Sequence, residues 1–562
     1  MNKYGTPGVR ISAERRQRIK DALESALRDG YAPSFVEEKG KGSVISEAVR
    51  RLKETGHPEP RRRLELSIEV ETKARDRGEE YFLPDWDLYS APGLAPAQVR
   101  RGKVARWILT AAQDDTDIHM GFFNNLRAYA GAIGAELVVA GFTYQTMVHT
   151  DRMALTDTYR AELKPFLRFE PMDCGPVIFF ANVNTLPTAV RPLSGMASMS
   201  RGRDAVFPHA KLAYETVPQP RGDYVPSIMT TGAVTVPNYI RKKAGLKAEF
   251  HHVLGATLVE VDGEGRAWCR PISATPEGDF QDLGTVVRAG QISRGNRIMA
   301  FTPGDIHCPS VQAEVFDNLW GSGDQSLINE LRPKYQFFHD LMSFEMASRH
   351  VDKDPLHRAM MVQNGTSGIE WQVQTGAKFL RAAERDFCQS VVIKSNHDDR
   401  LVQWMKKPID RNDIENVRYW HACNLAALDA ISAGDADFDL VRWALMGADS
   451  RRLEGIDFVP YGGSFKICQQ HGGGIECGMH GHEGANGTRG TAAGLAKMGS
   501  KVTIGDKHSP AIVDGVFVAG MTGDLDQGYN MGPGSWRRAH VLTYPNGKRT
   551  LVTQSPCGKW RA

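Results

Sequence analysis

The sequence lacks several features that would assign it to a class at once. It has no run of about 18 apolar residues, the length that crosses a membrane, and its first 20 residues are basic and polar without an apolar signal core. Its eight cysteines form no C-x-x-C pair, and no repeat of the solenoid type is present. The formal net charge is only +3. We therefore expect a cytoplasmic protein without a membrane partner, in which local basic patches would provide any affinity for nucleic acid.

The length and composition indicate a multidomain globular protein. A chain of 562 residues is too long for one hydrophobic core, and 41% hydrophobic with 24% charged residues is ordinary for a folded protein. We expect four regions: a helical N-terminal domain (1–63), a connecting arm (64–103), an accessory α/β domain (104–293) and a C-terminal domain (294–562).

The N-terminal region has the pattern of a helix-turn-helix unit. Helices are expected over Ser12–Asp29, Phe35–Glu38 and Ser43–Thr55, with a glycine turn before the third. The third helix carries basic residues at Arg50, Arg51 and Lys53. Residues 1–63 hold 15 Lys or Arg against 9 Asp or Glu, an excess suited to phosphate contact. We predict DNA binding here, with a plain three-helix packing unit as the alternative.

The accessory region begins as an α/β unit. Arg106–Ala112 and Ala135–Phe142 are expected strands on either side of a helix over Met120–Ile133, which predicts parallel pairing. Further strands are expected at Val177–Phe180 and Leu254–Val261. Residues 182–243 are rich in Pro, Gly, Ser and Thr, and a loop-rich region of this length is functional or packs against another subunit. A homo-oligomer is compatible with this pattern.

Two short motifs in this region receive structural interpretations. Asp117-Ile118-His119 could present two metal ligands, but polar residues separate it from the preceding strand, so we read it as a helix start. The glycines at 131 and 134 lie at the end of the expected helix, so we read a C-cap and not a dinucleotide-binding loop.

The C-terminal region contains apolar strands that end in clusters of His, Asp and Asn. The segments are Ile298–Phe301 before Asp305 and His307, Tyr335–Phe338 before Asp340, Ser390–Lys394 before Asn396 and His397, the approach to His480, and Lys501–Ile504 before Asp506 and His508. Two divalent cations held close together require such a mixture of carboxylates, imidazoles and an amide oxygen on rigid elements. One such strand end has little meaning, but five in sequence predict a metal centre.

The order of these motifs resembles the calcineurin-like metallophosphoesterase superfamily, whose pattern is D-x-H, G-D-x-x-D, G-N-H-D/E, H and G-H-x-H. The resemblance implies a four-layer α/β/β/α sandwich over residues 294–562. It assigns Asp305, His307 and His508 to a first metal, Asn396, His480 and Asp506 to a second, and Asp340 to both. By the same resemblance, His397 protonates the leaving oxygen or stabilises charge on the phosphate.

Three positions depart from the superfamily pattern. His339 precedes Asp340 in place of glycine and the distal Asp of that motif is absent, Ser395 replaces the glycine before Asn396, and Asp506 replaces a histidine. A hard carboxylate oxygen at Asp506 favours manganese, with magnesium as the alternative, over zinc.

An alternative assignment takes His471 as the single histidine and His480-x-His482 as the last motif. We prefer the set with Asp506 and His508 because Lys501–Ile504 is the better strand, and we expect His471 at a hairpin tip. His482, Arg489 in a glycine-rich stretch, Arg349 and His350 are candidates for contacting phosphate. A strand-to-helix turn at Arg489 and a solvated helix face at 349–350 are the structural alternatives.

A narrower resemblance is to the first-step-transfer proteins of T-five-like bacteriophages. It rests on the stretches SNHDDRL, HGHEGANGTRG and IGDKHSPAIVDGVF, on the tail Tyr544–Arg549, and on upstream segments at Met229–Pro237 and Ala248–His252, about the last 460 residues in all. The resemblance implies a metal-dependent nuclease that degrades host DNA in the bacterial cytoplasm.

We thus predict a two-metal phosphodiesterase acting on DNA. One alternative is a protein phosphatase or small-nucleotide phosphodiesterase on the same scaffold. The other, suggested by Asp506 and the altered second motif, is a DNA-binding regulator with a degenerate metal site.

Overall fold

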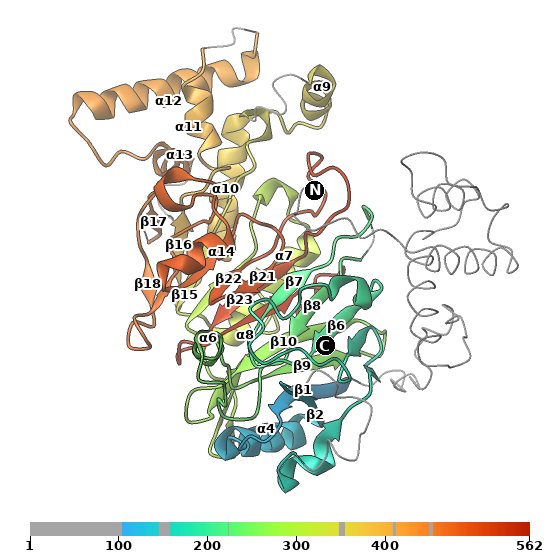
Figure 1. Ribbon diagram of the computed structural model, residues 1–562. Helices are drawn as coiled ribbons and strands as arrows, with labels where there is room; N and C mark the ends of the chain where they lie inside the picture. The colour runs from blue at the N-terminus through green and yellow to red at the C-terminus, as the bar shows by residue number, and fades with distance from the viewer. Residues whose placement is uncertain are drawn as a thin grey trace, which may run out of the picture. The chain divides into compact units, whose positions relative to one another are not determined.

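The computed structural model describes residues 104–144, 158–222, 224–347, 354–408, 412–448, 453 and 455–562, which belong to one compact unit of mixed α/β structure (Figure 1). The helix-turn-helix with Arg50, Arg51 and Lys53, the connecting arm, and the pair Arg349 and His350 lie outside the described residues. The boundary expected at 293/294 falls inside the compact unit.

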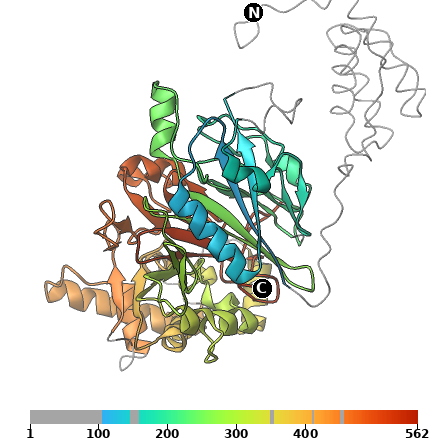
Figure 2. The same ribbon diagram turned by 90° about the horizontal axis from the view of Figure 1, so that it is seen from below.

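The first strand of the described part belongs to a five-stranded sheet. Its order is β10 (Ala267–Ser273), β9 (Gly255–Val261), β1 (Ala105–Gln113), β2 (Glu136–Phe142) and β3 (Leu167–Arg168). The predicted parallel pairing of β1 with β2 is confirmed. Helix α4 (Met120–Ile133) joins these two strands and lies across the sheet (Figure 2).

Both ends of α4 follow from local chemistry. The His119 ring accepts a hydrogen bond from the Phe122 amide at 3.1 Å, so Asp117–His119 starts the helix as predicted. Gly134 ends the helix with φ 64°, a left-handed backbone that glycine adopts without steric cost. The C-cap interpretation is confirmed.

A six-stranded sheet carries most of the predicted ligand-bearing strands. Its order is β17 (Asp457–Val459), β16 (Gln389–Ile393), β15 (Tyr335–Phe338), β14 (Ala300–Thr302), β23 (Ala539–Thr543) and β24 (Arg549–Thr553). Strands β14 to β17 run parallel, and β23 and β24 are antiparallel. The carboxyl ends of β14, β15 and β16 therefore meet at one edge of the sheet.

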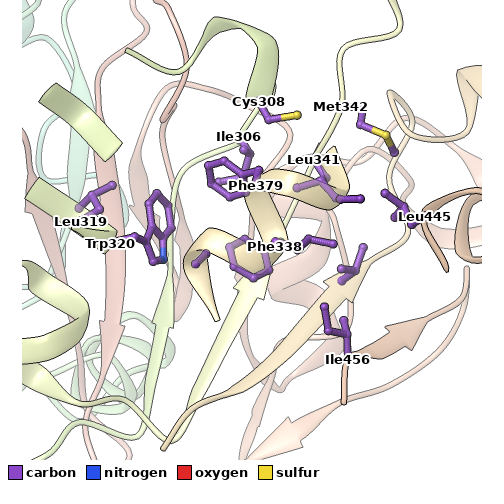
Figure 3. Close-up of a cluster of buried hydrophobic side chains, with 14 of the residues drawn as sticks. Ile306, Cys308, Leu319, Trp320, Phe338, Leu341, Met342, Phe379, Leu445 and Ile456 are labelled. Atoms are coloured by element: carbon purple, nitrogen blue, oxygen red, sulfur yellow. The ribbon is translucent and has the colours of Figure 1, made fainter. Parts of the chain in front are cut away.

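Helices pack on one face of this sheet and form the largest core. They are α7 (Ala313–Trp320), α8 (Leu327–Leu331), α10 (Ile369–Ala383), α11 (Arg400–Met405), α12 (Ile414–Ser432) and α13 (Leu440–Ala448). The Trp320 ring lies edge-to-face on the ring of Phe379, with centroids 5.1 Å apart, and its centroid is 6.2 Å from that of Phe338 (Figure 3). All three side chains are buried. Truncating such a buried tryptophan costs about 3–5 kcal/mol, so this cluster fixes the sheet on which the strand ends depend.

A ten-stranded sheet joins strands from both sides of residue 293. Its order is β18 (Lys466–Ile467), β19 (Ile475–Glu476), β20 (Lys501–Ile504), β22 (Val516–Val518), β21 (Ala511–Val513), β7 (Tyr214–Thr216), β8 (Ser227–Thr230), β6 (Asp204–Phe207), β5 (Val177–Phe179) and β4 (Met172–Asp173). Buried residues of β18 and β19 pack against the six-stranded sheet. Helix α14 (Ala492–Leu495) and the 3-10 turn η8 (Ala496–Met498) pack beside β20 and β22.

The remaining elements are short. They are the sheet β11 (Phe280–Asp282), β12 (Thr285–Arg288) and β13 (Gln291–Ser293), the helices α6 (Lys243–Phe250) and α9 (Pro355–Gln363), and the 3-10 turns at Ala161–Phe166, Ala197–Ser200, Cys308–Ser310, Glu345–Ala347 and Ala485–Gly487. Within the described ranges, no helix combines the length and the apolar content that crossing a bilayer requires.

Candidate metal centre

Loops after five strands bring the predicted ligands together. Asp305 and His307 follow β14, Asp340 follows β15, Asn396 follows β16, His480 follows β19, and Asp506 and His508 follow β20. The first three strands belong to the six-stranded sheet and the last two to the ten-stranded sheet, so the cluster lies where the two sheets meet.

The backbone is left-handed at four of these positions. The φ angles are 46° at His307, 43° at Asp340, 68° at Asp506 and 56° at His508. Non-glycine residues occupy this region at a cost of about 1–3 kcal/mol each, and such strain concentrates at functional sites. This backbone conformation turns each of the four side chains toward the ligand cluster directly after its strand.

Asp340 lies at the middle of the cluster. Its Oδ2 atom is 3.3 Å from Nε2 of His480, 3.7 Å from Nε2 of His307 and 4.0 Å from Nε2 of His508. A single carboxylate oxygen that faces imidazoles from both sheets is arranged as a bridge between two cations would be.

Two groups of ligand atoms share Asp340. His307, Asp340 and His508 form one, Asp305, Asp340 and His480 the other, and within each group the atoms lie within 4.8 Å of one another. Asp305 also lies 3.1 Å from His508, so its carboxylate is between the two groups. In the first group, the Nε2 atoms of His307 and His508 are 3.3 Å apart.

The other two predicted ligands lie beside His480. Its Nε2 atom is 2.9 Å from Oδ1 of Asn396 and 3.8 Å from Oδ1 of Asp506. The second oxygen of Asp506 contacts the ammonium group of Lys507, which leaves Oδ1 directed at the cluster. All seven predicted metal ligands are therefore gathered in one place.

The charges of the cluster are incomplete without a cation. Asp305 is fully buried, and among the described residues neither of its oxygens accepts a hydrogen bond of good geometry. Burial raises the pKa of Asp305 and lowers the pKa of His307 far below its usual value. Burial also disfavours the charged Asp340, but the surrounding histidines, His480 foremost, together outweigh it and lower the Asp340 pKa. A buried carboxylate without a hydrogen bond of good geometry is costly, so this group of donors could hold a metal cation.

His339 packs against this cluster from behind. Its ring stacks on that of His480 with centroids 5.4 Å apart, and the two Nδ1 atoms are 3.3 Å apart. When Nε2 of His480 faces a metal, its Nδ1–H is free to donate to Nδ1 of His339. His339, which stands where the second motif has glycine, thus gives the predicted ligand His480 a hydrogen-bond partner.

His397 lies beside the cluster and next to a guanidinium group. Its ring is 4.4 Å from that of His307, and its backbone amide donates to Oδ1 of Asp340 at 3.2 Å. Its Nε2 is 3.1 Å from Arg400, and since guanidinium can only donate, Nε2 accepts and Nδ1 carries the proton. Burial, together with the charge of Arg400, lowers the His397 pKa to about 3, so the ring is neutral.

Asp398 holds the loop that carries Asp340. Its carboxylate accepts hydrogen bonds from the amides of Leu341 and Met342 at 3.2 and 2.9 Å and from the Ser395 hydroxyl at 2.8 Å. Burial and the nearby Asp340 charge raise the Asp398 pKa to about 7. The small residue at 395 therefore supplies a hydrogen bond that glycine could not.

Sequence reasoning named no function for His339, Asp398 or Arg400. Asp398 and Arg400 belong to the stretch SNHDDRL that carries the predicted ligand Asn396, but the sequence does not indicate which residues they contact. It also missed Tyr529 and Trp536, whose rings lie 6.2 Å from His397 and 4.2 Å from His508 respectively. No pattern in the sequence links the loop of Tyr529 to the metal ligands.

The remaining candidates lie at the margin. His482 is half-buried, with its ring 5.3 Å from that of His480. Arg489 is exposed in the loop after His482. His471 is in the turn between β18 and β19, as expected for a hairpin tip, and it adjoins Gly547 instead of the ligand cluster.

Comparisons with known proteins give one informative relative. Protein A1 of Escherichia phage T5 is 35% identical to this chain over 474 residues, which cover 81% of this chain and 82% of the phage protein. No protein-family model matches the chain. No solved structure matches it either.

Proposed function

Because the chain belongs to the family of protein A1 of Escherichia phage T5, we propose that it is a phage nuclease, a phosphodiesterase that hydrolyses DNA with two divalent metal ions. The observation that supports this most is the shared, buried Asp340 between two groups of His and Asp ligands. The proposed fold of residues 294–562 is the four-layer α/β/β/α arrangement of metallophosphoesterases. Helices on one face of the six-stranded sheet, a second sheet on its other face, and α14 beyond that sheet support this assignment.

In this proposal, Asp305, His307 and His508 hold the first metal ion, Asn396, His480 and Asp506 hold the second, and Asp340 holds both. When bound, two such ions activate a water molecule and neutralise the oxygens of the phosphate. Asp506 supplies a hard oxygen where the superfamily has a histidine nitrogen, which favours manganese or magnesium. Metal analysis of protein purified without added metal should therefore find little zinc, and stoichiometric zinc would contradict this preference.

The residues around the ligands prepare the site for an anionic substrate. Arg400 is 3.1 Å from Nε2 of His397 and also donates to the Ser343 carbonyl at 2.8 Å, so its position is fixed. The Nδ1–H of His397 is buried and has no hydrogen-bond partner among the residues that the structure describes. A phosphate oxygen is the acceptor that this N–H lacks. In this neutral state His397 stabilises charge by hydrogen bonding, which is the second of the two roles expected for it.

The test is cleavage of plasmid DNA in Mn²⁺, Mg²⁺ or EDTA. Wild type should cut the plasmid in Mn²⁺ and lose activity in EDTA. Asp340→Ala should reduce the rate at least about a thousandfold, since it removes a ligand common to both ions. The matched control is Asp457→Ala on β17, which is exposed and outside the cluster.

A second measurement separates loss of metal from loss of folding. Circular dichroism should show both variants folded, and Mn²⁺ titration should show weak binding only in Asp340→Ala. Phosphomonoesters and cyclic nucleotides in the same assay test the substrate class. Wild-type cleavage by Asp340→Ala, or hydrolysis of these small substrates without DNA cleavage, would contradict the proposal.

A further inference from the structure

A cavity of about 690 Å³ lies away from the metal centre, and none of the proposed metal ligands lines it. Its wall includes Lys501 at the start of β20, whereas Asp506 and His508 follow the end of that strand. β20 runs from Lys501 to Ile504, which is three residue steps or about 10 Å at 3.3 Å per residue. The cavity and the metal centre are therefore at opposite ends of β20.

Segments from distant parts of the chain build the cavity. They are the end of α6, the turn between β21 and β22, the segment after η8 and the turn between β23 and β24. The β21–β22 turn is Asp514-Gly515, with φ angles of 49° and 87°, the positive values of a tight hairpin turn. The walls are thus made of hydrogen-bonded turns and strand ends.

The cavity is lined with more positive than negative charge. Five cations line it, Lys211, Lys497, Lys501, Lys548 and Arg549, against the single carboxylate of Asp514. That carboxylate is 2.5 Å from Lys211 and so is already paired. In the part of the chain that the structure describes, the other four cations form no ion pair.

Arg549 contributes charge without being available to a ligand. Arg549 is 4% exposed. Its guanidinium donates to the carbonyls of Val502 and Gly515 at 2.6 Å and lies 4.2 Å from the Phe517 ring centroid. Its charge is balanced by dipoles and a ring, and not by a carboxylate. The positive potential it creates therefore extends into the cavity.

The lysines of the cavity repel one another. Burial and the charge of Arg549 lower the pKa of Lys501. Burial and the charge of Lys501 lower the pKa of Lys548 to about 8. A bound anion would remove this repulsion, because each ammonium group would gain a charged partner. The half-buried ammonium groups of Lys501 and Lys548 are the available donors.

The size and the rim of the cavity favour a ligand larger than a bare phosphate. A volume of about 690 Å³ is in the range of sites for drug-sized molecules and cofactors. Its lining also includes apolar Leu212, Val253 and Ile512 and the ring of Phe250, a residue that is 81% exposed. A large aromatic residue exposed at the rim of a basic cavity offers a face for stacking a planar base.

We propose that this cavity binds a nucleoside monophosphate, with Lys501 and Lys548 contacting the phosphate and Phe250 contacting the base. The site is separate from the metal centre and does not depend on nuclease activity.

Isothermal titration with deoxyadenosine 5′-monophosphate in EDTA tests the proposal, with inorganic phosphate and deoxyadenosine titrated in parallel. One saturable site is expected for the nucleotide, and binding at least about tenfold weaker for each of the other two. The double variant Lys501→Gln, Lys548→Gln should weaken nucleotide binding at least about tenfold, since it removes two charge-assisted hydrogen bonds. Lys501→Arg, Lys548→Arg should retain most of the affinity.

Two controls locate the binding. Lys466→Gln, at an exposed position of β18 outside the cavity, should bind as wild type does. Asp340→Ala should also bind normally, because the metal centre is not the proposed site. Circular dichroism verifies that each variant is folded. The proposal is overturned if wild type shows no saturable binding, if inorganic phosphate binds as tightly as the nucleotide, or if only Asp340→Ala loses binding.

Discussion

Gly505 is the position where a single methyl group should disable the metal centre. This residue follows β20, and its amide donates to the carbonyl of His480 at 2.9 Å, which ties together two ligand loops. A Cβ atom built on Gly505 would lie 2.1 Å from Oδ1 of Asp305 and 3.0 Å from Cβ of His339. The first distance is shorter than real Cβ contacts and the second is tighter than most of them, so Gly505→Ala must move Asp305 or β20.

The cost of this movement can be worked from the packing. Asp305 is fully buried, and its backbone amide is bonded to the carbonyl of Gly520 at 3.0 Å, so its loop cannot shift freely. Overpacking a buried site costs about 1–3 kcal/mol. A ligand displaced by about 1 Å leaves the geometry a metal requires, so we expect Mn²⁺ affinity to fall at least about tenfold.

The assays are urea unfolding in EDTA and calorimetric titration with Mn²⁺. The matched control is Gly131→Ala in α4, where an added Cβ would meet nothing within 4 Å. Alanine there should stabilise the helix by up to about 1 kcal/mol and leave metal affinity unchanged. Wild-type stability and Mn²⁺ affinity in Gly505→Ala would refute the reasoning, because the close approach of Asp305 to the β20 end would then be wrong.

Two further predictions concern histidines. His339→Ala should weaken Mn²⁺ binding about 10- to 100-fold, because it removes the partner that orients His480. His339→Asn should recover part of the affinity. Equal Mn²⁺ affinities in wild type and both variants would contradict the orienting role of His339. The buried rings of His209 and His540 and the half-buried ring of His252 each have a pKa lowered to about 4, first by burial. The unfolded chain binds protons at these positions below pH 6.5 and the folded chain does not, so the free energy of unfolding should fall between pH 6.5 and 4, by up to about 3 kcal/mol for each ring. Urea titrations at pH 7, 5.5 and 4 in EDTA measure this, and a stability that does not change with pH would exclude buried neutral rings.

The elements that the sequence predicted best are those with a strong local signal. The helix expected at Met120–Ile133 and the strand at Lys501–Ile504 have the bounds that were expected. An amphipathic period, a capping side chain and a following glycine are all local, so they can be read from one stretch. The ten-stranded sheet, which combines strands from before and after residue 293, had no such local signal. The pairing of Ile512 with Tyr214, which joins its two halves, is a contact between residues 298 positions apart that no local pattern encodes.

The ligands of the candidate site could be named from the sequence because of a regularity of parallel sheets. The carboxyl ends of β14, β15 and β16 lie at one edge, so residues just after them must meet. The residues that orient the ligands could not be found in this way. Arg400 contacts His397 through the first turn of a helix, and Tyr529 reaches the same ring from a loop more than 120 positions later.

Three positions that differ from the superfamily pattern that the sequence resembles form a consistent set in three dimensions. His339 replaces glycine and supplies a partner for His480, Ser395 replaces glycine and supplies a partner for Asp398, and Asp506 replaces histidine with its second oxygen already paired to Lys507. Each change puts at least one polar atom against a partner, namely Nδ1 of His339, the Ser395 hydroxyl and one carboxylate oxygen of Asp506. Nε2 of His339 is buried and has no hydrogen-bond partner among the described residues. The three contacts hold His480, Asp398 and Asp506 in place, as a working metal centre requires.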